Sequence, residues 1–486
     1  MSAPPVIVLF RHDLRVADNP ALLAAVAAGG PLLCLFIHDE VSPGIRPLGG
    51  ASRWWLYHSL AALGASVERL SGTLHILRGN TVDLVPTLAR RLGASAVTWN
   101  RRYGAAEVAV DTALKAALTA SGISATSHNS HLLYEPWTVR TGAGTPFRVF
   151  TPFWRAARSL GEPLPPRPAP ARLSAAPWPP GSPARCSIED LGLLPGKPDW
   201  AEGLRAAWRP GEGDALARLA AFLGDGLAGY AAGRDRPDQA HASSLSPSLR
   251  FGEISPRQIF HAVHSAVLSG HASNRDGEKF LAEIGWREFS YHLLFHFPDL
   301  AKANFQPRFD DFPWRASGVA DLVAWQRGLT GFPLVDAGMR HLWQTGTLHN
   351  RVRMVVASFL VKDLLIDWRA GEAWFWDTLC DADPANNPAG WQWVAGSGAD
   401  AAPYFRIFNP VKQGETFDPA GIYVRGHVPE LAALPDEWIH QPFAAPPEVL
   451  HRARIELGKT YPAPILDRSF GRKRALAALA SLNGRR

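Results

Sequence analysis

The sequence predicts an α/β domain built on a doubly wound, parallel five-stranded sheet, followed by a larger all-helical domain. In the first 130 residues, short apolar runs rich in β-branched residues alternate with alanine- and leucine-rich segments of helical periodicity. After residue 210 the strand pattern fades and helical periodicity continues to the end. With 486 residues, of which 47% are hydrophobic and 19% charged, the chain is long enough for two or three folded domains.

The predicted strands are apolar runs too short for helices. They lie at 6–10, 32–37, 74–77 and 96–99, with a weaker run near Ile123. Helices are expected in the segments between them, for example at 21–28, 52–63 and 107–119. This alternation predicts parallel strands joined by helical crossovers.

The residues after the first strand, Arg11-His12-Asp13-Leu14-Arg15, contain none of the glycines of a dinucleotide-binding turn. Without them the backbone cannot approach a pyrophosphate closely, so we expect no dinucleotide in this domain. A proline-rich stretch from 160 to 198 predicts an extended connector. The expected organisation is therefore an α/β domain at 1–130, a linker at 131–210 and a helical domain at 211–486.

Cysteine usage and charge restrict the function classes. Cys34, Cys186 and Cys380 are far apart, which excludes a cysteine-held zinc site or four-cysteine iron–sulfur cluster within the chain, and we expect no metal. The first residues lack the features of a secretory signal, and no apolar run reaches the roughly 20 residues that span a bilayer. We therefore expect a cytoplasmic protein without a membrane partner. The net charge of +6 is a mild bias toward polyanionic partners.

Three blocks in the helical part carry unusual residue combinations. The first contains Tyr230, Arg234-Asp235 and the run Ser243-Ser244-Leu245-Ser246-Pro247. Hydroxyl residues before a proline-initiated helix cap its first turn, and they also bind phosphate there. A cap is the commoner role, and both roles stay open from these residues alone.

The second block places Glu283, Trp286 and Arg287 on one helix face, at spacings of three and four. An acid and a guanidinium at this spacing form a simple ion pair, whereas the same face can also line a pocket for a flat ring. The third block has two acids, two asparagines and two indoles within thirteen residues: Asp381, Asp383, Asn386, Asn387, Trp391 and Trp393. Turns and caps use Asp and Asn, but an aromatic-walled cofactor pocket explains more of these residue types.

The chain resembles the photolyase/cryptochrome family over nearly its whole length. The matching segments are FRHDLRVADNPAL, LSPSLRFGEISPRQ, WREFSYHLL, LHNRVRM, SFLVKDLLIDWR and WQWVAGSGADAAPYFRIFNP, of which the last is the most specific. The resemblance implies the same order of α/β domain, linker and helical catalytic domain with FAD. It also implies light-driven repair of cyclobutane pyrimidine dimers in DNA, as in the class I and class III photolyases of the family.

The resemblance implies a set of FAD-binding residues: Tyr230, Ala242, Ser243, Ser244, Leu245, Ser246, Phe280, Arg287, Arg353, Asp381, Asp383 and Asn387. Ala242 stands where relatives often have Thr, and Phe280 where some have Trp. Arg353 is expected to pair with Asp381 beside the isoalloxazine ring, and Asp383 to bond the ring edge. Asn387 matches the residue that faces flavin N5, where an amide can donate or accept as N5 changes protonation, whereas a carboxylate repels the reduced anion.

The resemblance also implies contacts to DNA and to the dimer, by Arg234, Glu283, Trp286, Arg287, Asn350, Arg351, Met354 and Trp393. A dimer stacks poorly, so extruding it from the duplex costs less than extruding intact bases. The two indoles would wall the pocket, while Glu283 and Asn350 would bond the base edges, Glu283 acting in catalysis. In relatives that repair (6-4) lesions, His replaces Asn350.

Three tryptophans and one further segment match family sites for electron transfer and light harvesting. Trp391, Trp368 and Trp314 match the family's electron-transfer triad, with a one-residue gap in the alignment at Trp314. The segment 100–104 matches the neighbourhood of a folate antenna site, although Gly104 replaces an acidic residue. We expect a methenyltetrahydrofolate antenna, with 8-hydroxy-deazaflavin as the second choice.

The alternative function is a cryptochrome-like blue-light photoreceptor with the same fold and flavin. The set of Glu283, Trp286, Asn350, Arg351 and Met354 favours repair, because a receptor does not need a dimer pocket. The expected partner is DNA that contains cyclobutane pyrimidine dimers, and the expected state is a monomer.

Overall fold

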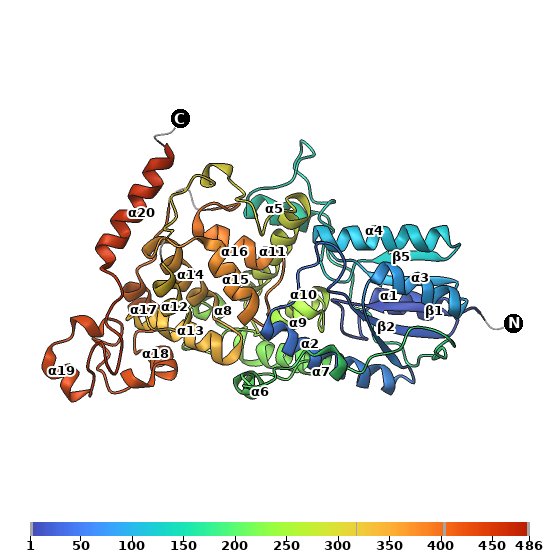
Figure 1. Cartoon of the computed structure of the whole chain (residues 1–486), viewed down its shortest axis with the longest axis horizontal. Helices are drawn as coiled ribbons and strands as arrows, with labels where there is room; N and C mark the ends of the chain where they lie inside the picture. Colours follow the sequence, from blue (N-terminus) through green and yellow to red (C-terminus); the bar gives the residue numbers. More distant parts are fainter. Residues whose placement is uncertain (1–2, 317, 402–404, 484–486) are drawn as a thin grey trace. The chain divides into compact units, whose positions relative to one another are not determined.

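The computed structural model describes residues 3–316, 318–401 and 405–483, and the chain forms two compact units (Figure 1). The first comprises Met1–Phe147, Thr151–Gly224 and Ser243–Pro298 and is called the sheet unit below. The second comprises Arg148–Phe150, Asp225–Ala242 and Asp299–Arg486 and is called the helical unit. These units do not follow the boundaries expected at 130 and 210, which stay predictions.

The sheet unit contains the predicted five-stranded parallel sheet, with strand order β3-β2-β1-β4-β5. The strands are β1 Val6–Phe10, β2 Leu32–His38, β3 Leu74–Arg78, β4 Ala96–Asn100 and β5 Ser124–His128. Every residue of β1 and β2 is buried, because helices cover both faces of a parallel sheet. That is why these segments are apolar throughout instead of alternating.

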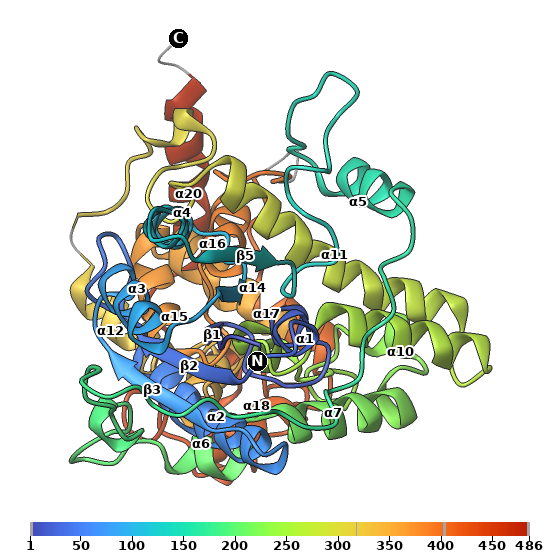
Figure 2. The ribbon, with the colours of Figure 1, turned by 90° about the vertical axis from the view of Figure 1, so that its right-hand side faces the viewer.

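The crossover helices are α1 Pro20–Ala27, α2 Gly50–Arg69, α3 Thr81–Leu92 and α4 Ala105–Ala120. Figure 2 shows α1 and α2 on one side of the sheet and α3 and α4 on the other. The chain reverses its direction across the sheet between β3 and β4, and right-handed crossovers then place the later helices on the opposite face. The doubly wound architecture predicted from the sequence is therefore confirmed.

The proline-rich connector is extended, as predicted, but it is bonded to the sheet unit. The Leu173 amide donates to the Leu70 carbonyl at 2.6 Å, and the Ala176 amide donates to the Leu32 carbonyl at 2.9 Å. Farther along, the Cys186 amide donates to the carbonyl of Ile76 in the edge strand β3 at 2.9 Å. The connector therefore covers part of an edge that would otherwise be open to pairing with another chain.

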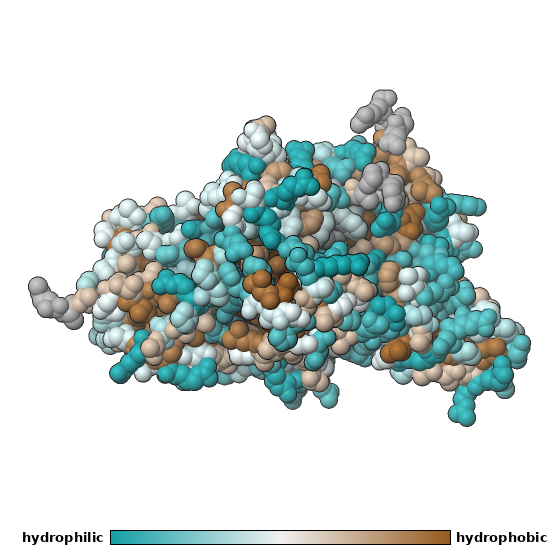
Figure 3. All heavy atoms as spheres, turned by 180° about the vertical axis from the view of Figure 1, so that it is seen from behind, coloured by the Kyte–Doolittle hydropathy of each residue, from teal (hydrophilic) through white to brown (hydrophobic). Residues whose placement is uncertain are grey.

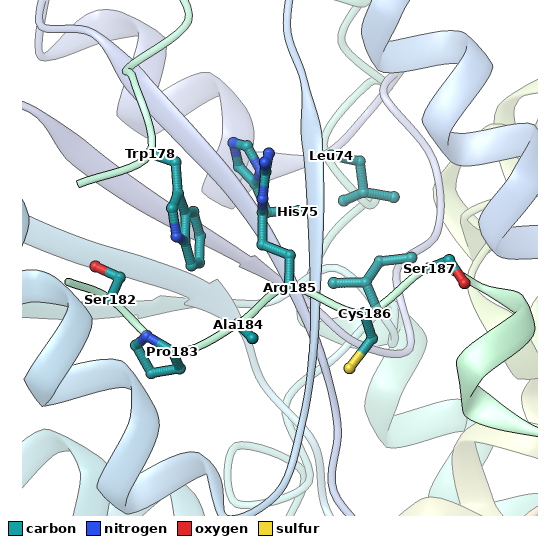
Figure 4. A pocket seen from close by; sticks show the side chains of 10 residues that line it. Leu74, His75, Trp178, Ser182, Pro183, Ala184, Arg185, Cys186 and Ser187 are labelled. Atoms are coloured by element: carbon teal, nitrogen blue, oxygen red, sulfur yellow. The ribbon is translucent and has the colours of Figure 1, made fainter. Parts of the chain in front are cut away.

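A pocket of about 530 Å³ lies where the connector meets β3 (Figure 4). Figure 4 shows the Trp178 indole beside the His75 ring and the Arg185 side chain. Arg185 donates to His75 Nδ1 at 3.4 Å, and the ring centroids of His75 and Trp178 are 4.9 Å apart. Burial lowers the pKa of His75 to about 4, so the ring is neutral near pH 7. None of the residues predicted to function lines this pocket, which anchors the connector.

The chain after residue 210 is helical, as predicted, and two further α-helices lie within the segment 131–210 that was expected to be a linker. These α-helices are α5 Phe150–Ser159, α6 Glu202–Ala207, α7 Glu212–Ala221, α8 Tyr230–Gly233, α9 Ser246–Phe251, α10 Pro256–Leu268, α11 Asn274–His296, α12 Val319–Gln326, α13 Pro333–Thr345, α14 Asn350–Ser358, α15 Trp368–Thr378, α16 Asn386–Ala395, α17 Pro410–Phe417, α18 Ile422–His427, α19 Pro447–Arg452 and α20 Arg468–Asn483. Single π-helical turns follow α7 and α14, at Phe222–Gly226 and Phe359–Asp363.

Much of the tryptophan content belongs to the core of the helical unit. Trp325, Trp368, Trp376 and Trp391 are buried in one apolar cluster formed mainly by α13 to α16 and α18. On the face that Figure 3 shows, apolar side chains form separate groups among hydrophilic ones. Among the described residues, no helix is long and apolar enough to cross a membrane, and the compartment stays a prediction.

Burial of Glu253 predicts a pH-dependent stability of the sheet unit. Glu253 follows α9, is 0% exposed, and accepts a hydrogen bond from Trp55 Nε1 of α2 at 2.9 Å. Burial raises the pKa of Glu253 from 4.5 to about 7, although its hydrogen bonds oppose the shift. The folded state therefore holds this proton more tightly than the unfolded state. Stability from this group is complete below pH 4.5 and is lost as the pH rises through about 7.

We expect Glu253→Gln to remove this component, which amounts to about 3 kcal/mol. Guanidinium unfolding of both proteins at pH 5 and pH 8 measures it. From pH 5 to pH 8, the guanidinium concentration at the unfolding midpoint should fall more for the wild-type protein than for the variant. Equal losses in both proteins would contradict the prediction.

Candidate functional site

The predicted ion pair between Arg353 and Asp381 is present in the helical unit. Arg353 Nη2 lies 2.7 Å from Asp381 Oδ2, and Arg353 Nε donates to the Leu348 carbonyl at 2.8 Å. The side chain of Asp381 is only 4% exposed, and its second oxygen, Oδ1, is buried without a hydrogen-bond partner among the described residues. A buried carboxylate oxygen without a donor indicates an acceptor position for a bound molecule.

Asp383 caps the segment that leads into α16. Its Oδ1 accepts hydrogen bonds from the amides of Ala385 at 2.8 Å and Asn386 at 2.6 Å, and its Oδ2 accepts from Asn386 Nδ2 at 2.6 Å. Asp383 therefore has the capping role that the sequence left open for the acids of the third block. The predicted bond from Asp383 to the flavin edge stays a prediction.

Asn387, in the first turn of α16, has a fixed amide. Its Nδ2 donates to the backbone carbonyl of Glu372 at 3.0 Å and to Glu372 Oε1 at 2.8 Å. Both acceptors belong to α15, and Glu372 is buried. Because the nitrogen side is held by these two acceptors, the amide oxygen is the atom left to face a ligand.

The three predicted electron-transfer tryptophans lie at one apolar cluster of the helical unit. Trp391 and Trp368 are buried within it, and the partly buried Trp314 packs against it. Trp368 Nε1 donates to Asn304 Oδ1 at 3.0 Å, whereas Trp391 Nε1 is buried without an acceptor in the described part of the chain. A Cβ at Gly371 would lie only 2.1 Å from the Trp391 ring, so glycine is required for this packing of α16 on α15.

The start of α14 carries three residues predicted to meet the dimer or DNA. Asn350 is exposed at the first position, and its Nδ2 is 4.0 Å from Met354 Sδ, one turn later. Arg351 forms an ion pair with Asp235, with 2.8 Å between Arg351 Nη2 and Asp235 Oδ2. In α16, Trp393 donates its Nε1–H to the Asp400 carbonyl at 3.1 Å.

In the sheet unit, α11 carries the second block, and the structure separates its members by burial. Glu283 and Trp286 are half-buried, whereas Arg287 is buried. Arg287 donates from Nη1 to the His131 carbonyl and from Nη2 to His131 Nε2, both at 2.7 Å. The structure does not support the predicted DNA contact of Arg287, because its guanidinium is buried and bonded within the sheet unit.

The serine run precedes α9, and the helix-cap interpretation is wrong. The capping position is Leu245, and no side chain among the residues that the structure describes caps the helix. In the described part of the chain the hydroxyls of Ser243, Ser244 and Ser246 have no hydrogen bond to protein, and Ser244 has a left-handed backbone with φ of 53°. Free hydroxyls leave the phosphate-binding alternative open. Ala242, just before the run, is exposed.

The two predicted aromatic contacts are buried. Phe280 packs on Phe222, with 4.5 Å between ring centroids, which is a core contact of the sheet unit. Tyr230 begins α8 of the helical unit, and the Arg234 guanidinium lies 5.7 Å from its ring centroid. Of the longest matching segment, Ala402, Pro403 and Tyr404 lie outside the described residues.

Comparisons with known proteins agree with this arrangement. Residues 6–171 match the family model described as DNA photolyase, and residues 280–481 match the FAD binding domain of DNA photolyase. A deoxyribodipyrimidine photo-lyase of Agrobacterium fabrum is 52% identical over 483 residues, which cover 99% of each chain. The chain belongs to the photolyase/cryptochrome family.

Two further relatives represent both branches of the photolyase/cryptochrome family. The crystal structure of a class III photolyase from Agrobacterium tumefaciens is 51% identical, with a TM-score of 0.95, and the match covers 100% of this chain and 98% of that one. Cryptochrome-1 of Arabidopsis thaliana is 41% identical over 98% of this chain and 70% of its own length.

The residues present fit the FAD that the family domain binds. In the helical unit, Asp381 Oδ1 is an acceptor without a donor among the described residues, and Asn387 has a fixed amide. In the sheet unit, the described residues provide no hydrogen-bond partner for the hydroxyls of the serine run. These groups match the chemistry of a flavin, whose ring edge donates and accepts and whose phosphates accept. The neutral serine hydroxyls can donate hydrogen bonds to the negatively charged phosphates of such a cofactor.

Two residues without a role assigned from the sequence hold predicted site residues in place. Glu372 fixes the Asn387 amide, and Asp235 holds Arg351. Asp235 was adjacent to a predicted residue, but no local pattern indicated its partner 116 positions later in the chain. For Glu372, the signal available in the sequence is an acid within a tryptophan-rich helical segment.

Loss of the Asp381 carboxylate should destabilise the protein and weaken FAD retention. In Asp381→Ala the guanidinium of Arg353, itself 28% exposed, loses its partner, which we expect to cost about 1–3 kcal/mol. Asp381→Asn keeps an acceptor and should lose less. The melting temperature and the ratio of flavin to protein absorbance after purification measure both effects. Full flavin content in Asp381→Ala would contradict the assignment.

Proposed function

We propose that this protein repairs cyclobutane pyrimidine dimers in DNA in a light-dependent reaction, as a deoxyribodipyrimidine photo-lyase. The observation that carries this proposal is the 52% identity, over 99% of both chains, to the enzyme of that name from Agrobacterium fabrum. The retained site residues support it. The expected partner is dimer-containing DNA, and we keep the prediction that the protein acts as a monomer.

The helical unit would contribute cofactor contacts from two helices. We assign Arg353 and Asp381 to the flavin ring edge, and Asn387 to N5. Bound reduced FAD supplies, on excitation by light, the electron that splits the dimer. Because Glu372 holds the amide nitrogen of Asn387, the amide oxygen is presented in one orientation, in which it would accept a hydrogen bond from a protonated N5 without rearrangement.

Further FAD contacts are assigned from the family match. Residues of the first block are assigned to the phosphates and the ribose of FAD: Tyr230, Ala242, Ser243, Ser244, Leu245 and Ser246. The absence of a side-chain cap at α9 supports a ligand role for the serine hydroxyls. Within the sheet unit, Arg287 is bonded to His131 and Phe280 packs on Phe222, so we assign them to supporting the cofactor residues rather than to direct contact.

The dimer contacts are assigned to side chains that have some exposure. Asn350 is exposed, Glu283 and Trp286 are half-buried, and all can meet a ligand without unfolding their helices. We assign Glu283 and Asn350 to hydrogen bonds with the base edges, and Trp286, Met354 and Trp393 to the apolar walls. Arg234 and Arg351 are assigned to the DNA backbone.

A folate antenna is the preferred second chromophore. The Tyr103 hydroxyl donates to Glu135 Oε2 at 3.0 Å, and Arg101 pairs with Glu135 at 3.2 Å. The Arg101 guanidinium also lies 5.8 Å from the ring centroid of Trp137, whose side chain is 37% exposed. An exposed indole beside a cation suits a flat ring with an acidic tail.

The direct test is repair under blue light. Flavin-reduced protein is mixed with an oligonucleotide that contains one thymine dimer, and restored thymines are counted by chromatography in light and in darkness. We expect repair in light alone. Glu283→Ala should repair about tenfold more slowly, because one hydrogen bond to the reacting base is lost. Repair in darkness, or no repair in light with fully reduced flavin, would reject the function. If the protein does not repair but its flavin is still reduced by light, the cryptochrome-like photoreceptor would be favoured.

Trp391→Phe should separate photoreduction from repair. Phenylalanine is much harder to oxidise than indole, so photoreduction of oxidised flavin by an external donor should be lost, while chemically reduced protein should still repair. Trp325→Phe is the matched control, since its ring centroid lies 6.1 Å from that of Trp391 in the same cluster. Flavin absorbance during illumination measures the effect. Unchanged photoreduction in Trp391→Phe would exclude Trp391 from the pathway.

A further inference from the structure

Asp235 in the helical unit faces two arginines through its two carboxylate oxygens. Oδ2 lies 2.8 Å from Arg351 Nη2, and Oδ1 lies 3.8 Å from Arg234 Nε. Arg351 belongs to α14, whereas Arg234 and Asp235 follow α8, so one carboxylate bridges two segments far apart in the sequence. Both arginines are those assigned above to the DNA backbone.

Aromatic rings support the same two guanidinium groups. The Arg351 guanidinium lies 4.3 Å from the Phe417 ring centroid, and the Arg234 guanidinium lies 5.7 Å from the Tyr230 centroid. The side chains of Arg351 and Arg234 are 15% and 12% exposed, and that of Asp235 is 36% exposed. Each arginine is therefore held by a ring face and by one shared carboxylate, with only part of its side chain open to solvent.

We propose that Asp235 determines the preference for damaged over undamaged DNA by fixing the positions of Arg351 and Arg234. The proposal rests on the function proposed above. Asp235 is a positioning residue, because it acts through the two arginines. An acid on a DNA-binding face is otherwise unfavourable, since it repels phosphates and lowers affinity for every sequence.

The physical argument concerns the freedom of the arginines. A mobile arginine turns toward the nearest phosphate of any duplex and stabilises undamaged and damaged DNA alike. A fixed arginine binds only where the backbone itself reaches its position. A dimer weakens stacking and lowers the cost of deforming the duplex, so damaged DNA reaches fixed arginines at lower cost than intact DNA does. Asp235 thus lowers the affinity for DNA in general and increases the preference for damaged over undamaged DNA.

The test compares binding of Asp235→Asn and wild-type protein to two duplexes that differ only in one thymine dimer. Dissociation constants are measured in darkness at one salt concentration. We expect affinity for the undamaged duplex to rise about two- to fivefold, because a repelling charge is removed. The ratio of the two dissociation constants should fall about three- to tenfold, because the arginines lose their fixed positions. Asp235→Glu should recover part of this ratio.

Asp238→Asn is the matched control. Asp238 lies three residues away and pairs with Arg236 at 2.5 Å, so the substitution makes the same change in charge beside a different arginine. We expect it to shift both affinities by a similar factor and to leave the ratio within about twofold of wild type. Melting temperature and flavin content should match wild type in all variants used.

The outcomes separate the two proposals. Suppose that wild-type protein restores thymines in blue light and prefers the dimer duplex. If Asp235→Asn then keeps that preference, or changes the ratio of dissociation constants no more than Asp238→Asn does, the proposed role of Asp235 is wrong and the proposed function stands. If wild-type protein neither repairs nor prefers the dimer duplex, both proposals are wrong. A loss of preference in Asp235→Asn alone, with partial recovery in Asp235→Glu, supports the proposal.

Discussion

The ion pair between Arg353 and Asp381 joins the two helices on which the predicted chemistry depends. Arg353 belongs to α14, and Asp381 begins the turn that Asp383 caps into α16. Because Asp381 is almost fully buried, its charge requires a partner, and this requirement fixes α14 against the turn. The position of Asn387 follows from that turn, and its amide orientation follows from Glu372. A small set of buried polar contacts thus sets the geometry of the candidate cofactor site.

The sheet could be predicted closely because its local pattern and its tertiary environment agree. A parallel strand covered on both faces is apolar throughout, and the runs at 6–10 and 32–37 show this pattern plainly. The contacts of the connector could not be predicted. Prolines indicate an extended chain, but they do not indicate which strand it follows, because that choice depends on residues more than 100 positions away.

In the candidate site too, the sequence could identify residues but could not identify the partners that they contact. Motif matches located Arg353, Asp381 and Asn387, and the structure places them on adjoining helices or turns of the helical unit. The same kind of match assigned Arg287 to DNA, yet His131 binds its guanidinium inside the sheet unit. Helical spacing states which face a side chain occupies, but only the packed neighbours decide whether that face meets solvent, ligand or protein.

The unbonded indole N–H of Trp391 has a kinetic consequence. An oxidised tryptophan is a far stronger acid than neutral indole and normally gives its proton to a nearby base or to water. At Trp391 the nitrogen is buried, and the described residues offer it no acceptor. The radical cation would therefore keep its proton and remain a good acceptor for an electron from the next indole. On the predicted electron-transfer route, electron transfer from another tryptophan of the triad would then outcompete deprotonation at Trp391, and proton loss would occur at a tryptophan with more exposure to water.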